Sequence, residues 1–271
     1  MYGAIIGDIV GSPFEFKLNA STKDFELFSG RSRFTDDTVM TIAVAQGLLD
    51  AGKNAELPDI TDTVGKSMHE WGRRYPDSGY GSKFAKWLKS DTPCPYGSCG
   101  NGSAMRVSPA GWLYDNIKRT REVAVATASP THNDPEGIKG AEATASAIYL
   151  ARKGRTKEEI RKYIEDNFSY DLSLKCAEIR LRNRQSARCQ ETVPEALCAF
   201  LEGGDFIDVI RTAVSLGGDC DTLAAISGSV AEAFYGIPPY AIQEAKKRLP
   251  QEMLSIIDRF EHTLQSEKRT N

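Results

Sequence analysis

Apolar residues recur at intervals of three and four along most of the chain, which is the spacing of one face of an α-helix. The segment 35–52 is apolar around most of its circumference, a pattern typical of a helix enclosed by other helices. Further segments with the helical period follow along the chain. The sequence predicts a helix over each of them: 60–75, 81–90, 135–154, 156–168, 192–204, 206–218, 221–236, 239–250 and 251–265.

The ends of several segments carry helix signals. Thr156 is followed by glutamates, which favours an N-cap and a stabilised first turn. No stretch alternates apolar and polar residues, and no βαβ order is visible. We therefore predict an all-α protein of ten or more short helices. Because no composition break marks a linker, we predict one domain over 1–271, with a frayed end at about 265–271.

Composition narrows the range of functions. A net charge of −3 gives no electrostatic reason to expect a nucleic-acid partner, and no apolar run has the length of a membrane span. The N-terminus lacks the basic region of a signal peptide. The six cysteines form no CxxC pair and only three histidines are present, so a zinc site is disfavoured. Scattered free thiols favour a cytoplasmic protein.

Two clusters of oxygen-bearing side chains stand directly before apolar helices, TDDT at 35–38 and DCDT at 219–222. One reading is that each is only a helix cap, because Asp and Thr are favoured at helix N-termini. However, a cap uses one side-chain oxygen, and two carboxylates 4 Å apart repel by about 1 kcal/mol even in water. If the clusters meet, four carboxylates converge, and a hard divalent cation such as Mg²⁺ or Mn²⁺ would neutralise them.

Three other features carry candidate chemistry. Asp8 and Glu15 lie among glycines near the N-terminus; the alternative is that Asp8 satisfies a turn and Glu15 is solvated. The glycine-rich segment 96–106 leads into a helix and has backbone N–H groups that could hold a phosphate or a sugar. His132 lies in a polar loop, where a lone histidine is more often solvated than functional. None of these signals is specific alone.

Five motifs together resemble the ADP-ribosylglycohydrolase family, which includes the dinitrogenase-reductase-activating glycohydrolases. The motifs follow the order that is typical of the family and span most of the chain. They are GDIVGSPFE (7–15), TDDT (35–38), GNGSAMR (100–106), TH (131–132) and GGDCDT (217–222).

The resemblance implies a compact orthogonal multi-helix fold with a binuclear metal centre in a central cleft. The implied reaction is hydrolysis of the C1″ bond between ADP-ribose and an acceptor, with release of ADP-ribose. The acceptor is an ADP-ribosylated protein side chain, or a modified nucleic acid or small molecule. The cofactors are two Mg²⁺ or Mn²⁺ ions. The residues that match the metal ligands are Thr35, Asp36, Asp37, Asp219, Asp221 and Thr222.

The same resemblance assigns catalytic and substrate-binding positions. Glu15 matches a loop glutamate near the scissile bond. From the chemistry of the reaction we expect Asp36 or Asp37 to be both a metal ligand and the base for the attacking water. Cys99 and Pro93 stand where some members of the family carry aromatic residues that pack on the ligand, so Tyr96 or Trp112 is expected to supply that stacking. The positions that match substrate-binding residues are Asp8, Gly97, Ser98, Gly100, Asn101, Gly102 and His132.

Other functions stay open at this point. The chain could bind ADP-ribose without turnover, could be a structural member of the family, or could be a different two-metal hydrolase that acts on a phosphoester. The arginine-rich segment 180–188 is either a solvated face or a basic rim for a diphosphate or an acidic partner. Acceptor choice is not determined by the sequence. With no coiled-coil heptads, a monomer is favoured.

Overall fold

Helices make up the regular secondary structure of the computed structural model, which describes residues 1–16, 22–182 and 185–268. The described residues form 15 helices and no β-strand, so the all-α prediction is confirmed. The helices are α1 (Tyr2–Gly11), α2 (Asp36–Ala51), α3 (Leu57–Arg74), α4 (Ser82–Lys89), α5 (Gly102–Met105), α6 (Ser108–Leu113), α7 (Ile117–Ala128), α8 (Pro135–Arg152), α9 (Lys157–Phe168), α10 (Cys176–Arg182), α11 (Cys189–Glu202), α12 (Phe206–Ser215), α13 (Cys220–Tyr235), α14 (Pro239–Lys246) and α15 (Gln251–Lys268).

The periodic segments are confirmed as helices to within a few residues at each end. Thr156 caps α9 as expected, because its side chain accepts from the Glu159 N–H while the Glu159 carboxylate accepts from the Thr156 N–H. Helices α1, α7 and α10 were not predicted. For α1 the reason is that all ten of its residues are buried, so it has no amphipathic period. Residues 269–271, part of the predicted frayed end, lie outside the described residues.

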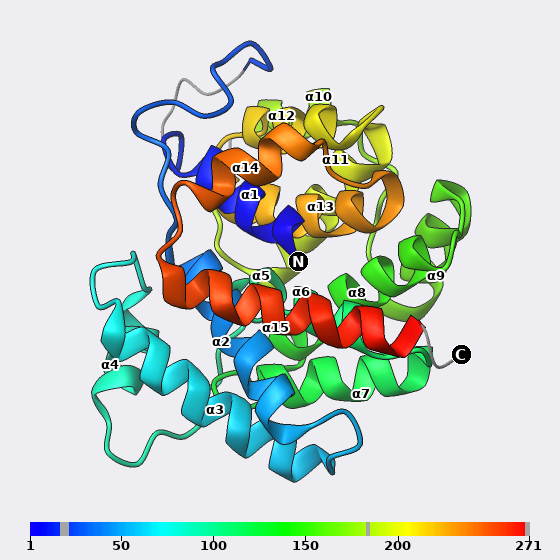
Figure 1. Ribbon diagram of the computed structural model, residues 1–271. Coiled ribbons are helices and arrows are strands. Elements are labelled where there is room, and N and C mark those ends of the chain that lie inside the picture. The colour runs from blue at the N-terminus through cyan, green and yellow to red at the C-terminus, as the bar shows by residue number, and fades with distance from the viewer. Residues whose placement is uncertain (17–21, 183–184, 269–271) are drawn as a thin grey trace.

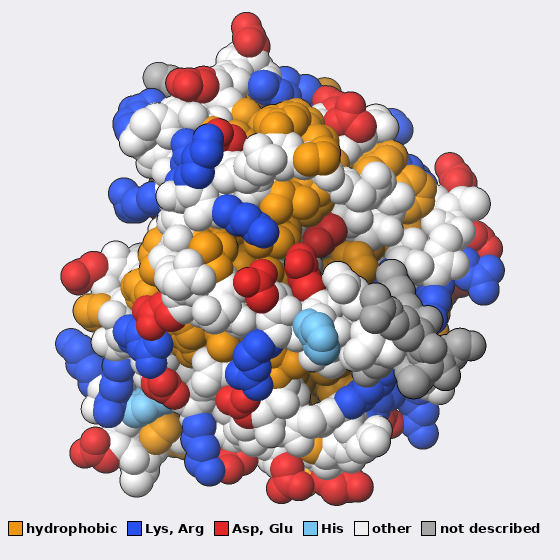
Figure 2. Space-filling model, in the orientation of Figure 1, with side chains coloured by type: hydrophobic (Ala, Val, Ile, Leu, Met, Phe, Trp, Pro, Cys, Tyr) orange, Lys and Arg blue, Asp and Glu red, His pale blue; other side chains and the backbone are white. Residues whose placement is uncertain are grey.

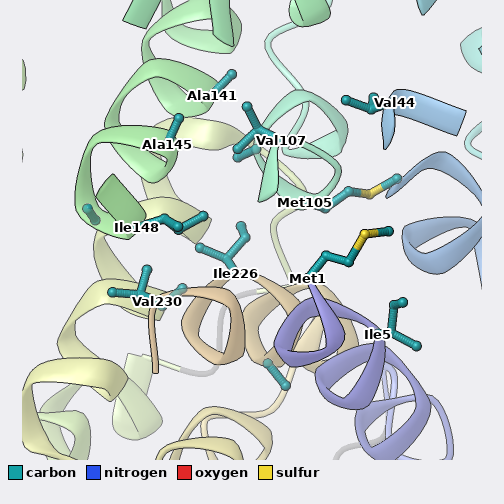
Figure 3. Packing of buried hydrophobic residues seen from close by; sticks show 14 of the residues in the cluster. Met1, Ile5, Val44, Met105, Val107, Ala141, Ala145, Ile148, Ile226 and Val230 are labelled. Atoms are coloured by element: carbon teal, nitrogen blue, oxygen red, sulfur yellow. The ribbon is translucent and has the colours of Figure 1, made fainter. Parts of the chain in front are cut away.

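Helix α13 forms the centre of the molecule and contacts α1, α8, α11 and α12. It is buried continuously from Cys220 to Ala231, as the small apolar residues of this segment allow. In Figure 3, Ile226 and Val230 of α13 lie near Ile148 of α8 in the core. Figure 1 shows α15 crossing the face of the molecule between the α1–α13–α14 group and the α2–α3 group.

Glycines allow α1 to lie directly against α13. A Cβ atom at Gly7 would lie 2.1 Å from the backbone oxygen of Ala224, and one at Gly11 would lie 2.3 Å from the Cα atom of Asp221. Real Cβ atoms do not approach so closely, so these positions require glycine for the observed helix spacing. This contact places the beginning of α13 beside the end of α1.

Among the described residues, none of the helices combines the length and the hydropathy needed to cross a bilayer. On the face drawn in Figure 2, lysine and arginine side chains are interspersed with aspartate and glutamate side chains. All six cysteines belong to the described residues and are free, as expected from their scattered positions.

Candidate active site

A cavity of about 400 Å³ opens where seven separate parts of the chain meet. Its wall is formed by the residues after α1, the N-termini of α2 and α13, the segment that leads into α4, the glycine-rich loop with α5, His132 and Ala187. A cavity of this size is ordinary for a small-molecule site. The acidic and glycine-rich motifs, distant in sequence, therefore share one enclosed space.

Asp8 lies behind the cavity and holds the N-terminus of α2. It is fully buried, and its carboxylate accepts from the backbone N–H groups of Thr35 (2.8 Å) and Thr38 (3.0 Å) and from both threonine hydroxyls. Burial raises the pKa of Asp8, and the hydrogen bonds from both threonines oppose that rise. Asp8 is not among the described residues that line the cavity. Its contacts are those of a residue that positions the TDDT segment.

The two acidic clusters meet at the cavity. Asp37 is connected to the second cluster because the Thr222 hydroxyl donates to its Oδ2 atom at 3.2 Å. Asp36 lines the cavity and is partly exposed, whereas Asp219 and Asp221 are buried. These four carboxylates come from the N-termini of α2 and α13, where helix dipoles favour negative charge.

Glu15 adds a fifth carboxylate to the cluster. One oxygen each from Glu15, Asp219 and Asp221 lie within 4.8 Å of one another, which is the spacing of groups that can share a metal ion. Glu15 is positioned by the chain after α1, where the Phe16 N–H donates to the Gly218 carbonyl at 2.7 Å. Phe16 has a positive φ of 52°, an uncommon backbone conformation for an aromatic residue. The expected meeting of Glu15 with the aspartates is therefore present.

Burial and mutual repulsion act against ionisation of this cluster. Burial, followed by the charges of Asp8 and Asp219, raises the pKa of Asp36 to about 8. Burial, and to a lesser extent the negative charges of Asp8 and Asp221, raise the pKa of Asp37 well above its usual range. The pKa of Glu15 also rises, through burial and then Asp219. Within the described residues, no basic side chain forms an ion pair with any of these carboxylates.

The donor set fits a hard divalent cation. Oδ1 of Asp37 is buried and has no hydrogen-bond partner, which is costly for a carboxylate oxygen unless a cation compensates it. The Thr35 and Thr222 hydroxyls donate their protons to Asp8 and Asp37, respectively, so each oxygen keeps a lone pair for another partner. Thr35 itself is not among the described cavity-lining residues. Carboxylate and hydroxyl oxygens are the ligands that Mg²⁺ and Mn²⁺ prefer.

The glycine-rich loop contributes Ser98, Gly100, Asn101 and Gly102 to the cavity wall. The Asn101 side-chain amide donates to Asp219 Oδ2 at 2.7 Å and so joins the loop to the acidic cluster. Gly97 lies away from the wall.

Several backbone donors of this loop are already occupied by protein acceptors. The N–H of Gly97 donates to Asn133 Oδ1, that of Gly100 to Ser98 Oγ, and that of Asn101 to the Ala187 carbonyl. The expected phosphate cradle is therefore restricted to the other backbone donors of the loop.

His132 lines the cavity, but both of its ring nitrogens are engaged. Nδ1 lies 2.7 Å from the Thr131 hydroxyl, and Nε2 lies 3.1 Å from the Gly100 carbonyl, which can only accept. Nε2 therefore carries the proton and Nδ1 accepts from Thr131. Burial and then the charge of Arg106 lower the pKa of His132 to about 3. The ring is neutral at physiological pH and supports the glycine-rich loop.

The cavity wall also contains residues that the sequence patterns did not assign: Phe16, Lys83, Phe84 and Arg106. A basic residue inside an otherwise apolar stretch, AMRV at 104–107, is a signal that identifies Arg106 as a buried charge. The two phenylalanines give no comparable signal.

Of the two aromatic residues considered for stacking, Tyr96 lines the cavity, whereas Trp112 is not among its described lining residues. The Tyr96 ring lies 6.5 Å from the His132 ring, centre to centre, at an angle of 45°. Tyr96 is therefore better placed than Trp112 to stack on a ligand in the cavity.

The arginine-rich segment 180–188 contributes Ala187 to the cavity wall. Arg180 donates to the Ser215 hydroxyl, and Arg182 lines a separate surface depression. Arg184 lies outside the described residues. Neither Arg180 nor Arg182 is among the described residues that line the acidic cavity.

Comparison with known proteins identifies the family. A family model described as ADP-ribosylglycohydrolase matches residues 1–269. The chain is 28% identical over 309 residues to the ADP-ribosylhydrolase ARH3 of Homo sapiens, covering 87% of this chain and 84% of that protein. It is 24% identical over 280 residues to the ADP-ribosylarginine hydrolase Tri1 of Pseudomonas putida, covering 90% of this chain and 72% of that protein.

The fold is also found in a solved structure. A chain titled ADP-ribosylglycohydrolase-related protein complex superposes with a TM-score of 0.71 at 24% identity, covering 97% of this chain and 95% of that chain. Since the family model extends over nearly the whole sequence, this protein belongs to the ADP-ribosylglycohydrolase family.

Proposed function

We propose that this protein is a divalent-metal-dependent ADP-ribosylhydrolase that cleaves the C1″ glycosidic bond between ADP-ribose and an acceptor and releases ADP-ribose. The observation that carries the proposal is the meeting of Asp36 and Asp37 with Asp219 and Asp221 at one cavity, with Glu15 beside them. Most enzymes that hydrolyse glycosidic bonds use a pair of carboxyl groups. The cavity has such groups, and family membership supports the reaction class.

Two Mg²⁺ or Mn²⁺ ions are the proposed cofactors. Bound divalent ions of this kind supply Lewis acidity, which orients sugar hydroxyls and lowers the pKa of water. The unpartnered Oδ1 atom of Asp37 and the absence of an ion pair to the cluster within the described residues support this proposal. The residues that would hold the ions are Thr35, Asp36, Asp37, Asp219, Asp221 and Thr222.

The catalytic roles follow from the environments of the carboxylates. We assign Asp36 or Asp37 as the base that takes a proton from the attacking water, because both lie in the cavity wall. Glu15 is half-buried and has a raised pKa, which favours a protonated form that can donate to the departing acceptor. The remaining carboxylates stabilise the positive charge that develops at C1″.

Substrate binding is proposed for the glycine-rich side of the cavity. Ser98, Gly100, Asn101 and Gly102 would contact the diphosphate and ribose, and Tyr96 would stack on the adenine. His132 supports this side through its bond to the Gly100 carbonyl. Gly97 and Asp8, which lie away from the cavity wall, would position the loop and the TDDT segment instead of contacting the ligand.

The acceptor is proposed to be a protein side chain. The relatives from Homo sapiens and Pseudomonas putida are named as an ADP-ribosylhydrolase and an ADP-ribosylarginine hydrolase, so arginine-linked and other protein-linked ADP-ribose are the first substrates to try. A panel assay tests the proposal. Arginine-linked, serine-linked and nucleic-acid-linked ADP-ribose and O-acetyl-ADP-ribose are each offered with Mg²⁺ or Mn²⁺, and free ADP-ribose is measured.

The expected result is release of ADP-ribose from at least one protein-linked substrate, and loss of that release with EDTA. Tight binding of ADP-ribose without turnover of any substrate would instead identify a binding protein. Release of inorganic phosphate from a phosphoester would identify a different two-metal hydrolase. Full activity of an Asp219→Ala/Asp221→Ala protein in EDTA would contradict the metal-dependent mechanism.

A further inference from the structure

Arg106 is a buried cation that has no anionic partner among the described residues. Its side chain is 1% exposed and lies at the end of α5, in the wall of the acidic cavity. The Nη2 atom donates to the carbonyls of Thr127 and Ala128 and to the Thr131 hydroxyl, at 3.2, 3.4 and 2.9 Å. All of these acceptors are neutral. A buried guanidinium without an anionic partner is unfavourable, because neutral acceptors do not replace its hydration fully.

The other side of the guanidinium faces the cavity. The Nε atom is buried and has no hydrogen-bond partner. The Nη1 atom lies 4.0 Å from the position that a Cβ atom on Gly102 would take, and Gly102 belongs to the cavity wall. Burial lowers the pKa of Arg106 to about 10, so the guanidinium still carries its charge at neutral pH. An anion in this part of the cavity would compensate the charge and could accept a hydrogen bond from Nη1.

The cavity wall carries charges of both signs. Its described lining residues include five carboxylates and two basic side chains, Arg106 and the exposed Lys83. His132, beside Arg106, is neutral and cannot supply charge. Three backbone N–H groups of the glycine-rich loop are occupied by protein acceptors. Arg106 is thus the buried positive charge among the described residues of the cavity wall.

We propose that Arg106 is a ligand-binding residue that pairs with the diphosphate of the substrate. This inference rests on the proposed function for the identity of the ligand. It adds that Arg106 contacts the diphosphate, which is the anionic middle part of that ligand. Arginine suits this role because its guanidinium stays charged and its N–H groups form charge-assisted hydrogen bonds with phosphate oxygens. With Nη2 held by the segment 127–131, the guanidinium is oriented before the ligand arrives.

The test compares ligands with and without the diphosphate. Binding of ADP and of adenosine to the full chain is measured by calorimetry in EDTA, for wild type and Arg106→Gln. We expect Arg106→Gln to weaken ADP binding at least about tenfold, the size of a lost charge-assisted hydrogen-bonded pair, and to change adenosine binding less than about twofold. Unchanged ADP binding, or equal loss of both ligands, would overturn the proposal, as would a wild type that does not bind ADP at millimolar concentration.

Two further variants separate charge from structure. Thr131→Val removes the Thr131 anchor of Nη2 but keeps the guanidinium, so it is expected to retain the preference for ADP over adenosine. If Thr131→Val loses that preference as fully as Arg106→Gln does, Arg106 acts only through the loop and the proposal fails. If Arg106→Gln does not fold, Arg106→Lys is measured instead. Because lysine keeps the positive charge, the preference for ADP over adenosine is expected to persist at reduced strength. Complete loss of this preference would contradict the charge pairing.

The outcomes for Arg106 and for the proposed function can be told apart. ADP binding that depends on Arg106, in a protein that hydrolyses no ADP-ribosylated substrate, supports the binding role and contradicts the enzyme. Hydrolysis with an unchanged KM in Arg106→Gln supports the enzyme and contradicts the binding role. The binding and the hydrolysis measurements are made on the same purified proteins.

Discussion

The hydroxyl of Thr222 donates a hydrogen bond to the carboxylate of Asp37 at 3.2 Å, across 185 residues of sequence. Each residue lies in the first turn of a buried helix, Asp37 in α2 and Thr222 in α13. This bond joins the two acidic motifs at the cavity. It also explains why neither motif is only a helix cap, because their side chains face each other as well as their own helices.

Asp37→Asn is expected to abolish metal-dependent hydrolysis while making the metal-free protein more stable. The substitution removes a buried charge that has unfavourable interactions with Asp8 and Asp221, so the melting temperature in EDTA should rise. Activity should fall by at least about 10³-fold, as for removal of a group that acts directly in the reaction. Asp62→Asn, which alters only an exposed i,i+4 pair with Lys66, is the matched control. A fully active Asp37→Asn protein would contradict the assigned role.

Glu15→Gln is expected to lower kcat by about 10²- to 10⁴-fold, the usual contribution of a proton donor, with a smaller effect on KM. Gln keeps the size of the side chain but cannot supply a proton. Steady-state kinetics on a protein-linked substrate measure both constants, and the bound Mg²⁺ or Mn²⁺ content is measured in parallel. A change confined to KM would show that Glu15 contributes to binding and not to the chemical step.

The metal-free protein is expected to lose stability as the pH rises from about 4 toward 8. The pKa of Asp36 is raised from 3.8 to about 8 in the folded chain, and those of Asp37 and Asp221 are raised well above the same value. A raised folded pKa stabilises the protein below the unfolded value, and this stabilisation is lost as the pH rises through the folded value. Urea unfolding at pH 5 and pH 8 in EDTA measures the change. A metal-free protein that is more stable at pH 8 would contradict this prediction.

Gly11→Ala is expected to destabilise the protein by about 1–3 kcal/mol, the typical cost of overpacking. The new Cβ atom would lie 2.3 Å from the Cα atom of Asp221, so α1 and the beginning of α13 would have to separate. Alanine favours a helix over glycine by under about 1 kcal/mol, which does not offset the clash. Gly30→Ala, with no atom within 4 Å of the added Cβ, is the control. Activity should fall for Gly11→Ala alone, since Asp221 would be displaced.

Tyr96→Ala is expected to raise KM about tenfold, whereas Tyr96→Phe should remain within about twofold of wild type, because stacking on a base depends on the ring and contributes about 1–3 kcal/mol. Tyr96 is the aromatic residue from the glycine-rich segment that lines the cavity. Trp112→Phe, outside the described cavity wall, is the control. Equal KM values for Tyr96→Ala and wild type would contradict stacking by Tyr96 and would favour Phe84 or Phe16 as the residue that stacks on the adenine.

Local patterns in the chain were sufficient to predict the all-α class and most helix positions, because amphipathic period and capping residues act over a few neighbouring positions. They missed α7 and α10, and they failed for α1, whose ten residues are all buried and therefore show no polar face. The oxygen-rich motifs could be recognised in the same way, since dense carboxylates before apolar helices are unusual in any context.

Tertiary packing determined which residues lie next to one another at the site. Asp8 matched a substrate-binding position by motif, yet its hydrogen bonds to Thr35 and Thr38 place it behind the cavity. Arg106 ends the GNGSAMR motif, yet the motif gives it no role, and its importance depends on which groups surround a residue that is 1% exposed. Contacts between segments far apart along the chain depend on helix spacing, set here by the glycines of α1 against α13, and no local pattern encodes that spacing.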